Sequence, residues 1–245
     1  MNQKMDFDRK ILNTIILNAR PGAGKSELIK FMRSLDLETR IKDYHVGRIH
    51  VIDDFPYLWR WFEEDDILEN MGKERFYSDH EGYFKYDYLW DVLIHLINLE
   101  YTKFLRDFKD WQDYTVFIEF SRGVQHGGYQ RAYPLLSEEI MKLASILYVN
   151  VSWEESLRKN RQRFNPDKPD SILEHGIPDK KLEFMYSGSD FDTFTSNDTD
   201  FINMKGRHIS YSVFENEDDV TTQPKPEMQS RLKDCLDYLW ERNNN

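Results

Sequence analysis

The chain has 245 residues, of which 40% are hydrophobic and 31% charged, so it can bury the core of one α/β domain and global disorder is not expected. Its formal net charge of −11 disfavours long-range attraction of nucleic acid or of an anionic membrane surface. Cys235 is the only cysteine, which excludes an intramolecular disulfide, and no run approaches the ~18 apolar residues that span a bilayer.

The N-terminal half reads as an alternation of strands and helices. Its first ten residues lack the apolar region of a signal peptide, so we expect a cytoplasmic protein. An apolar run rich in β-branched residues predicts a strand over 11–18, and helical spacing predicts a helix over 26–35. A second strand is predicted over 46–53. Residues 54–86 read as irregular, aromatic and acidic, and residues 87–108 as a long amphipathic helix.

The C-terminal half continues this alternation. The predicted strands are 115–120, 145–151 and 208–214, and the predicted helices are 135–144, 154–164 and 227–240. The predicted loops are 121–128, 165–178 (with three prolines), 186–200 and the linker 224–226. Because strand and helix alternate, we expect a mostly parallel five-stranded sheet with helices on both faces, forming a single domain over 1–245. Ligands on such sheets bind beyond the carboxyl ends of the strands.

A glycine-containing segment, Ala19-Arg20-Pro21-Gly22-Ala23-Gly24-Lys25-Ser26, follows the first predicted strand. It matches the P-loop pattern except at Ala19, where glycine is usual. Small residues let successive backbone N–H groups wrap an anion, and the helix that begins near Lys25 directs its positive end at the same place. An accidental glycine turn before a helix is the alternative. We predict that the phosphates of a nucleoside triphosphate are bound by Pro21, Gly22, Ala23, Gly24, Lys25, Ser26 and Glu27.

With this segment, the chain resembles the P-loop kinases of small molecules, the group of nucleoside, nucleoside monophosphate and uridine-kinase-like enzymes. The order of elements extends the resemblance over roughly residues 11–240. The resemblance implies a three-layer P-loop NTPase fold, ATP and Mg²⁺ as bound groups, and a small-molecule acceptor for the phosphoryl group. It also implies that Lys25 reaches the β- and γ-phosphates and that Ser26 offers its hydroxyl to Mg²⁺.

Two adjacent carboxylates, Asp53 and Asp54, end the second predicted strand. Phosphoryl transfer to a hydroxyl needs a carboxylate that accepts the proton and aligns the acceptor oxygen. In uridine-kinase-like and deoxynucleoside-kinase-like enzymes a strand-end acid at this point is that base. Both residues are therefore candidates for the base, with Asp53 also a candidate for contact with Mg²⁺. The structural alternative is an Asx turn or a cap for the following helix.

Glu119 lies within the otherwise apolar third strand, where an ionised carboxylate is costly unless it is paired or near a metal. Since the third strand of related proteins carries the Walker B acid, Glu119 is a candidate for holding Mg²⁺ through its water shell. Arg122, three residues later, resembles the arginine with which deoxynucleoside kinases contact the acceptor or a phosphate. An ion pair between Glu119 and Arg122 is the structural alternative.

A basic helix follows the fourth predicted strand and contains Arg158, Lys159, Arg161 and Arg163. Guanidinium groups suit phosphate oxygens and neutralise the charge that develops during transfer. In the resembling kinases this segment forms a lid, so we expect residues 154–185 to be lid-like, with Arg158 and Arg161 catalytic and Arg163 on the nucleotide. A solvated helix face paired with neighbouring glutamates is the alternative.

The segment between the second and third predicted strands, 55–110, is rich in aromatic residues and corresponds to the acceptor side of related kinases. Aromatic faces there would stack on a flat base or sugar, or form the core of the insertion. His126 lies in the loop after Glu119 and is a further candidate for contact with the acceptor.

The leading hypothesis is an ATP-dependent phosphotransferase whose acceptor is a small-molecule hydroxyl or phosphate, such as that of a nucleoside or nucleotide. The alternatives are a P-loop ATPase acting as a nucleotide-dependent switch, and a zeta-toxin-like kinase or a kinase of nucleic-acid ends. The acidic composition disfavours the nucleic-acid version. We expect neither a nucleic-acid partner nor a membrane contact.

Overall fold

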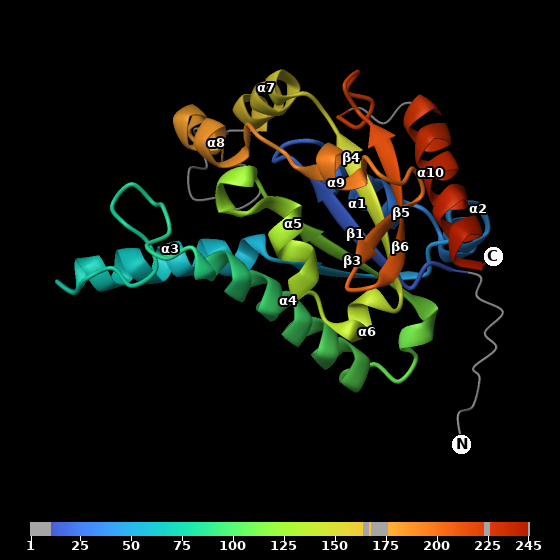
Figure 1. Ribbon diagram of the computed structural model, residues 1–245, viewed down its shortest axis with the longest axis horizontal. Helices are drawn as coiled ribbons and strands as arrows, with labels where there is room; N and C mark the ends of the chain where they lie inside the picture. The colour runs from blue at the N-terminus through green and yellow to red at the C-terminus, as the bar shows by residue number, and fades with distance from the viewer. Residues whose placement is uncertain (1–10, 164–166, 168–175, 223–225, 245) are drawn as a thin grey trace.

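The sheet of the computed structural model has six strands in the order β2-β3-β1-β4-β6-β5 (Figure 1). The described residues are 11–163, 167, 176–222 and 226–244. The strands are β1 (Thr14–Ala19), β2 (Arg48–Asp53), β3 (Tyr114–Phe120), β4 (Ala144–Asn150), β5 (Phe201–Met204) and β6 (Arg207–Glu215). All neighbours pair in parallel except β5 and β6, which are antiparallel. The expected mostly parallel sheet is confirmed, whereas the expected number of five strands is wrong.

The additional strand, β5, is an edge strand of four residues that pairs with β6 across a tight turn. In the turn Lys205 and Gly206 both have positive φ, 52° and 81°, a conformation that glycine adopts readily. This strand follows residues 186–200, a stretch rich in Ser, Thr, Asp and Asn that the sequence predicts to be a surface loop. That expectation is also wrong at α9 (Phe191–Thr195), because Phe191 is buried and its ring stacks on Tyr148 at 3.8 Å between centroids.

Helices cover both faces of the sheet, which makes three layers (Figure 1). Beyond α9 they are α1 (Lys25–Ser34), α2 (Leu37–Tyr44), α3 (Phe55–Asn70), α4 (Tyr88–Asp107), α5 (Gly128–Ala132), α6 (Glu138–Met141), α7 (Trp153–Arg163), α8 (Asp179–Tyr186) and α10 (Pro226–Asn244). One apolar core packs α1, α2 and α10 against the sheet, and the other packs α4, α5 and α6 against the opposite face. Among the described residues, no helix has the length and apolar character to cross a bilayer.

Two helix predictions differ from the structure. Residues 55–70, expected to be irregular, form α3, whose aromatic residues occur around the helix rather than along one stripe, so the periodic signal is weak. Residues 135–144, expected to be one helix, contain the end of a 3-10 turn (Tyr133–Leu135), the short α6 and the first residue of β4. Pro134 lies in that turn and Ser137 caps α6, accepting from the N–H of Ile140, so the chain changes direction between them.

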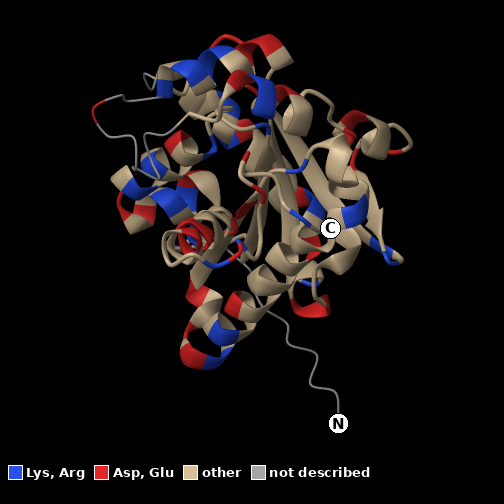
Figure 2. Ribbon diagram, turned by 90° about the vertical axis from the view of Figure 1, so that its left-hand side faces the viewer, with Lys and Arg blue, Asp and Glu red and all other residues tan. Residues whose placement is uncertain are grey.

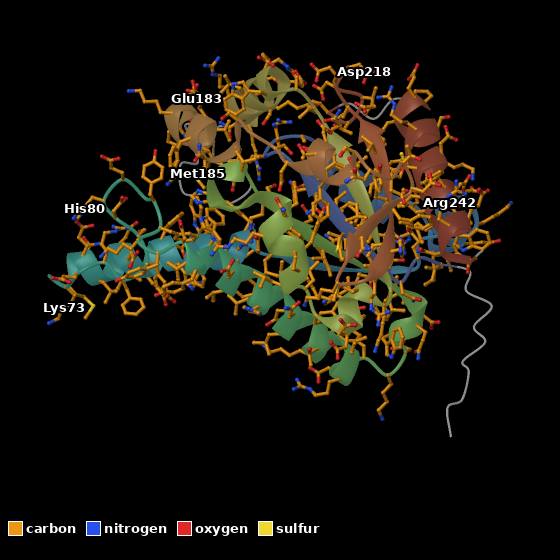
Figure 3. The ribbon with its side chains drawn as sticks, viewed as in Figure 1. Lys73, His80, Glu183, Met185, Asp218 and Arg242 are labelled. Atoms are coloured by element: carbon orange, nitrogen blue, oxygen red, sulfur yellow. The ribbon has the colours of Figure 1, made fainter. Side chains whose placement is uncertain are left out.

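An arm, residues 55–87, projects from the sheet on its β2 side (Figure 1). Asp65 of α3 is fully buried and accepts hydrogen bonds from the N–H of Tyr77, at 3.0 Å, and from the N–H and hydroxyl of Ser78, at 2.6 and 2.7 Å. These bonds tie the loop after α3 back onto the helix. Lys73 and His80 lie at the outer end of the arm, away from the sheet (Figure 3).

Candidate active site

A cleft of about 1140 Å³ opens at the carboxyl ends of β1, β2 and β3. We name the two halves of the cleft after the ligands that the sequence predicts for them. The phosphate half is lined by residues 21–27, Lys30, Glu119, Ser121, Lys159, Asn160, Gln162, Arg163 and Thr222. The acceptor half is lined by residues 53–55, Leu58, Trp59, Phe62, Asp79, Gly82, Tyr83, Phe84, Asp87, Trp90, Arg122, His126 and residues of α8. The predicted glycine-containing segment and the predicted strand-end carboxylates therefore face one cleft. Charged residues of both signs are mixed over the surrounding helices, while the central strands are mostly uncharged (Figure 2).

The segment 19–26 is held in shape by α7 and by the residues after β6. Gly22 has φ +76°, and a Cβ added there would lie 3.2 Å from the backbone N of Asn160. Gly24 has φ +110°, and a Cβ there would lie 2.6 Å from the hydroxyl oxygen of Thr221. Asn216 donates to the carbonyl of Ala23 at 2.7 Å. Both glycines are thus required by conformation and by space, and α1 begins directly after them at Lys25.

Lys25 lines the cleft directly after the two glycines and interacts electrostatically with the carboxylates of Glu119, Asp53 and Asp54. Its Nζ donates to the hydroxyl of Ser121 at 3.0 Å. Burial lowers the pKa of Lys25, while the nearby carboxylates of Glu119, Asp53 and Asp54 raise it. An amine in this position can form charge-assisted hydrogen bonds with an anion above the glycine-containing segment.

Asp53 and Glu119 are paired in register on neighbouring parallel strands, so their side chains lie on the same face of the sheet. Burial, and then the charge of Glu119, raises the pKa of Asp53 to about 7. Burial also raises the pKa of Glu119, which Lys25 opposes. No group of three His, Cys, Asp or Glu among the described residues could hold a metal by itself. Two carboxylates and the Ser26 hydroxyl suit Mg²⁺, which keeps waters and takes further oxygen ligands from phosphates.

The raised pKa of Asp53 predicts a pH-dependent stability. In the folded state the pKa of Asp53 is about 7, whereas its ordinary value is 3.8. Below about pH 4 the carboxyl is protonated in both the folded and the unfolded state, and the free energy of unfolding is unaffected by this shift. As the pH rises toward 7 the carboxyl ionises in the unfolded state first, so the free energy of unfolding decreases. The variant Asp53→Asn has no carboxyl to ionise at this position, so its free energy of unfolding does not decrease in this way. Its melting temperature, measured without divalent cations, should therefore increase relative to that of the wild type between pH 5 and pH 8. A constant difference over that range would contradict the assignment.

Asp54 and Arg122 form a buried ion pair, 2.7 Å between Oδ2 and NH1, with side chains 8% and 3% exposed. Arg122 also donates to the carbonyl of Ser121 at 2.7 Å and lies over the Trp90 ring, 5.1 Å from its centroid. Burial raises the pKa of Asp54 and the charge of Arg122 opposes that effect. The ion pair of Arg122 is therefore with Asp54 and not with Glu119, the partner considered from the sequence.

Removing Arg122 is expected to destabilise the fold. The variant Arg122→Met leaves Asp54 buried without its cationic partner, and breaking such a pair costs about 3–5 kcal/mol. The matched control is Arg131→Met, which breaks the more exposed pair of Arg131 with Asp91 and should cost about 1 kcal/mol or less. Denaturant unfolding measures both values, and equal losses in the two variants would contradict a buried role for Arg122.

The predicted basic helix is present as α7, but its arginines do not all reach the cleft. Arg158 pairs with Glu155 and with Asp219, and Arg161 pairs with Asp179. Neither lines the cleft, so their catalytic roles remain predictions that this arrangement does not support. Arg163 does line it. Residues 164–166 and 168–175, most of the expected lid loop, lie outside the described part of the chain.

Several residues in or beside the cleft were given no individual role by sequence reasoning, although Lys159 was counted in the basic helix. Lys159, 6% exposed, has its Nζ 2.6 Å from Asp219 Oδ1 and joins α7 to the segment after β6. Ser121 holds Lys25, and Asn216 and Thr221 pack against Gly24. Polar residues directly after a predicted strand were the available signal for Ser121 and Asn216, because this edge of a parallel sheet is where ligands bind.

No protein-family model matches the chain, and no curated protein matches it. Among solved structures, the crystal structure of TT1252 from Thermus thermophilus has a TM-score of 0.47 and 14% sequence identity, over 94% of this chain and 96% of that one. Neither these searches nor the similarity to that structure identifies an activity.

Proposed function

We propose that this chain is an ATP-dependent phosphotransferase that acts on a hydroxyl of a small molecule. The observation that carries the proposal is the convergence of three features on one cleft: the constrained glycines at 22 and 24, the amine of Lys25, and the paired carboxylates Asp53 and Glu119. Each feature suits a different part of the same reaction, namely anion binding, charge neutralisation and proton acceptance.

The phosphate half of the cleft would hold ATP and Mg²⁺. Residues 22–27 would bind the phosphates through backbone N–H groups and the Lys25 amine, with Ser26 and Glu119 as the oxygen ligands toward Mg²⁺. Bound in this way, the triphosphate supplies the phosphoryl group. Arg163 lines the same half, and its charge acts on both Lys25 and Glu119. We assign to Arg163 the charge neutralisation that the sequence suggested for Arg158 and Arg161.

Asp53 is the proposed base. Its pKa near 7 is suited to accepting a proton at neutral pH. Asp54 forms a buried ion pair with Arg122. Its proposed role is therefore to hold Arg122 in the wall of the acceptor half and not to accept a proton. The Asx interaction considered from the sequence is also present. Asp53 Oδ1 accepts a hydrogen bond of 2.9 Å from the N–H of Phe55, the first residue of α3. This bond fixes the carboxylate in place and leaves its second oxygen for an acceptor hydroxyl.

The proposal is tested by screening small-molecule alcohols for ATP-dependent phosphorylation, with product detection by mass spectrometry. A phosphotransferase should hydrolyse ATP slowly by itself and consume it rapidly when a particular acceptor is added. ATP hydrolysis that no alcohol accelerates, but that a protein partner does, would instead identify a nucleotide-dependent switch.

A further inference from the structure

Two buried side chains from outside the glycine-containing segment bind the carbonyls of alternate peptide units within it. The hydroxyl of Ser156, in α7, donates to the carbonyl of Pro21 at 2.7 Å. The amide of Asn216, directly after β6, donates to the carbonyl of Ala23 at 2.7 Å. Both side chains belong to residues with 0% exposure, and neither lines the cleft. The two carbonyls are therefore bonded toward the protein interior and not toward the cleft.

Each of these bonds also fixes the N–H group of the glycine that follows the carbonyl. In a trans peptide unit the C=O and N–H groups point in opposite directions, and none of the described peptide bonds is cis. The N–H of Gly22 therefore points away from Ser156, and the N–H of Gly24 points away from Asn216. Both glycines line the cleft, and among the described residues neither N–H has an acceptor. Two donors are thus directed to a place where a phosphate chain can accept from them.

The side-chain amide of Asn216 has a single favourable orientation. Besides the Ala23 carbonyl, its nitrogen donates to the hydroxyl of Thr221 at 2.8 Å, and its oxygen accepts from the N–H of Val220 at 3.1 Å. A flipped amide would place its oxygen against the Ala23 carbonyl and its NH₂ group against the N–H of Val220. The orientation of Asn216 therefore determines that of the peptide unit between Ala23 and Gly24.

The two parts of the chain that carry these side chains, α7 and residues 216–222, are joined to each other. Glu217 accepts from the N–H and the hydroxyl of Ser152, just before α7, at 2.7 and 2.8 Å. Asp219 pairs with Lys159, which is 6% exposed, at 2.6 Å, and with Arg158 at 2.8 Å. A loop held by such a support binds an anion without first becoming ordered, and ordering would otherwise reduce the affinity.

We propose that Ser156 and Asn216 are positioning residues for phosphate binding: each holds one carbonyl of the glycine-containing segment so that the next N–H is presented to a phosphate chain. The proposal rests on the proposed function for the identity of the anion. Neither residue touches the ligand, and they lie 135 and 193 positions along the chain from the carbonyls that they bind. Without its side-chain donor the peptide unit can rotate, and an N–H that turns from the cleft loses a charge-assisted hydrogen bond.

The test is isothermal titration calorimetry with inorganic tripolyphosphate and Mg²⁺, which requires neither a nucleoside nor phosphoryl transfer. The variants Ser156→Ala and Asn216→Leu remove the two donors. Each should bind tripolyphosphate about tenfold or more weakly than the wild type, the effect of losing one hydrogen bond to a charged group. Melting temperatures check folding, and Asn216→Ala, which also lacks the donor, replaces Asn216→Leu if that variant does not fold.

The matched controls are Asn13→Leu and Ser145→Ala, which alter buried, hydrogen-bonded residues near the amino ends of β1 and β4, opposite to the cleft. Asn13 is 9% exposed and donates to the carbonyls of Gln112 and Tyr114 at 2.9 and 3.2 Å. Ser145 is 0% exposed and accepts from Asn243 at 2.5 Å. Both controls should have lower melting temperatures than the wild type and the same affinity for tripolyphosphate.

A second measurement, made on the free protein, separates peptide orientation from general destabilisation. The carbonyl ¹³C resonance of Ala23 should move upfield in Asn216→Leu, and that of Pro21 in Ser156→Ala, because each carbonyl loses its donor. The proposal fails for a residue whose variant binds tripolyphosphate as tightly as its control or leaves that resonance unchanged. A wild type without affinity for tripolyphosphate would overturn it together with the proposed function. The expected affinities without phosphorylation of any alcohol would reject the proposed function alone.

Discussion

Replacing Lys25 with methionine is expected to lower phosphoryl transfer by at least about 10²–10³-fold, because it removes a preorganised cation from the developing charge. Methionine has an unbranched side chain one atom shorter than that of lysine, and it cannot donate to a phosphate or to Ser121. The loss of the amine should also raise the pKa of Glu119 and of Asp53 further, since Lys25 opposes the effect of burial on both. The measurements are steady-state turnover and equilibrium binding of ATP.

The matched control is Lys42→Met, which removes an exposed lysine of α2, outside the cleft. It should leave turnover and ATP binding unchanged. If Lys25→Met turned over ATP as fast as this control, the assignment of the phosphate half would be wrong.

Replacing Asp53 with asparagine is expected to lower transfer by about 10²–10⁴-fold, the range typical for loss of a general base. The amide keeps the shape of the carboxylate and can still accept from the N–H of Phe55, so α3 should begin as before. Affinity for ATP without Mg²⁺ should change little, since the glycines and Lys25 are intact. Single-turnover kinetics with a saturating acceptor measure the transfer step directly.

The comparison variant is Asp54→Asn, which weakens the buried pair with Arg122. It should lower stability, whereas Asp53→Asn should not at pH 8. A variant Asp53→Asn with wild-type transfer rates would show that another group accepts the proton.

Five of the six strands, the mostly parallel sheet and the edge that carries the cleft were predictable because short apolar runs alternate with amphipathic helices. The glycine-containing segment was predictable for a different reason, as its residue types are dictated by backbone geometry at Gly22 and Gly24. Asp53 and Glu119 were found because a carboxylate at a strand end or within an apolar strand requires an explanation.

The remaining features depend on long-range packing that local pattern does not encode. The partner of Arg122 is Asp54, 68 positions earlier in the chain, and Arg158 is held by Asp219, 61 positions later. The helix α3 was missed because its aromatic residues contact the cleft on one side and other aromatic rings on another, which removes the single apolar stripe that predicts a helix.

The most direct test of the phosphate site is the chemical-shift change of backbone amides when ATP and Mg²⁺ are added to ¹⁵N-labelled protein. The largest changes should occur at Gly22, Gly24, Lys25 and Ser26, and inorganic tripolyphosphate should reproduce them without a nucleoside. Amides of these residues that stay unshifted at saturating ATP would contradict the account, because residues 22–27 are the proposed contacts of the phosphates.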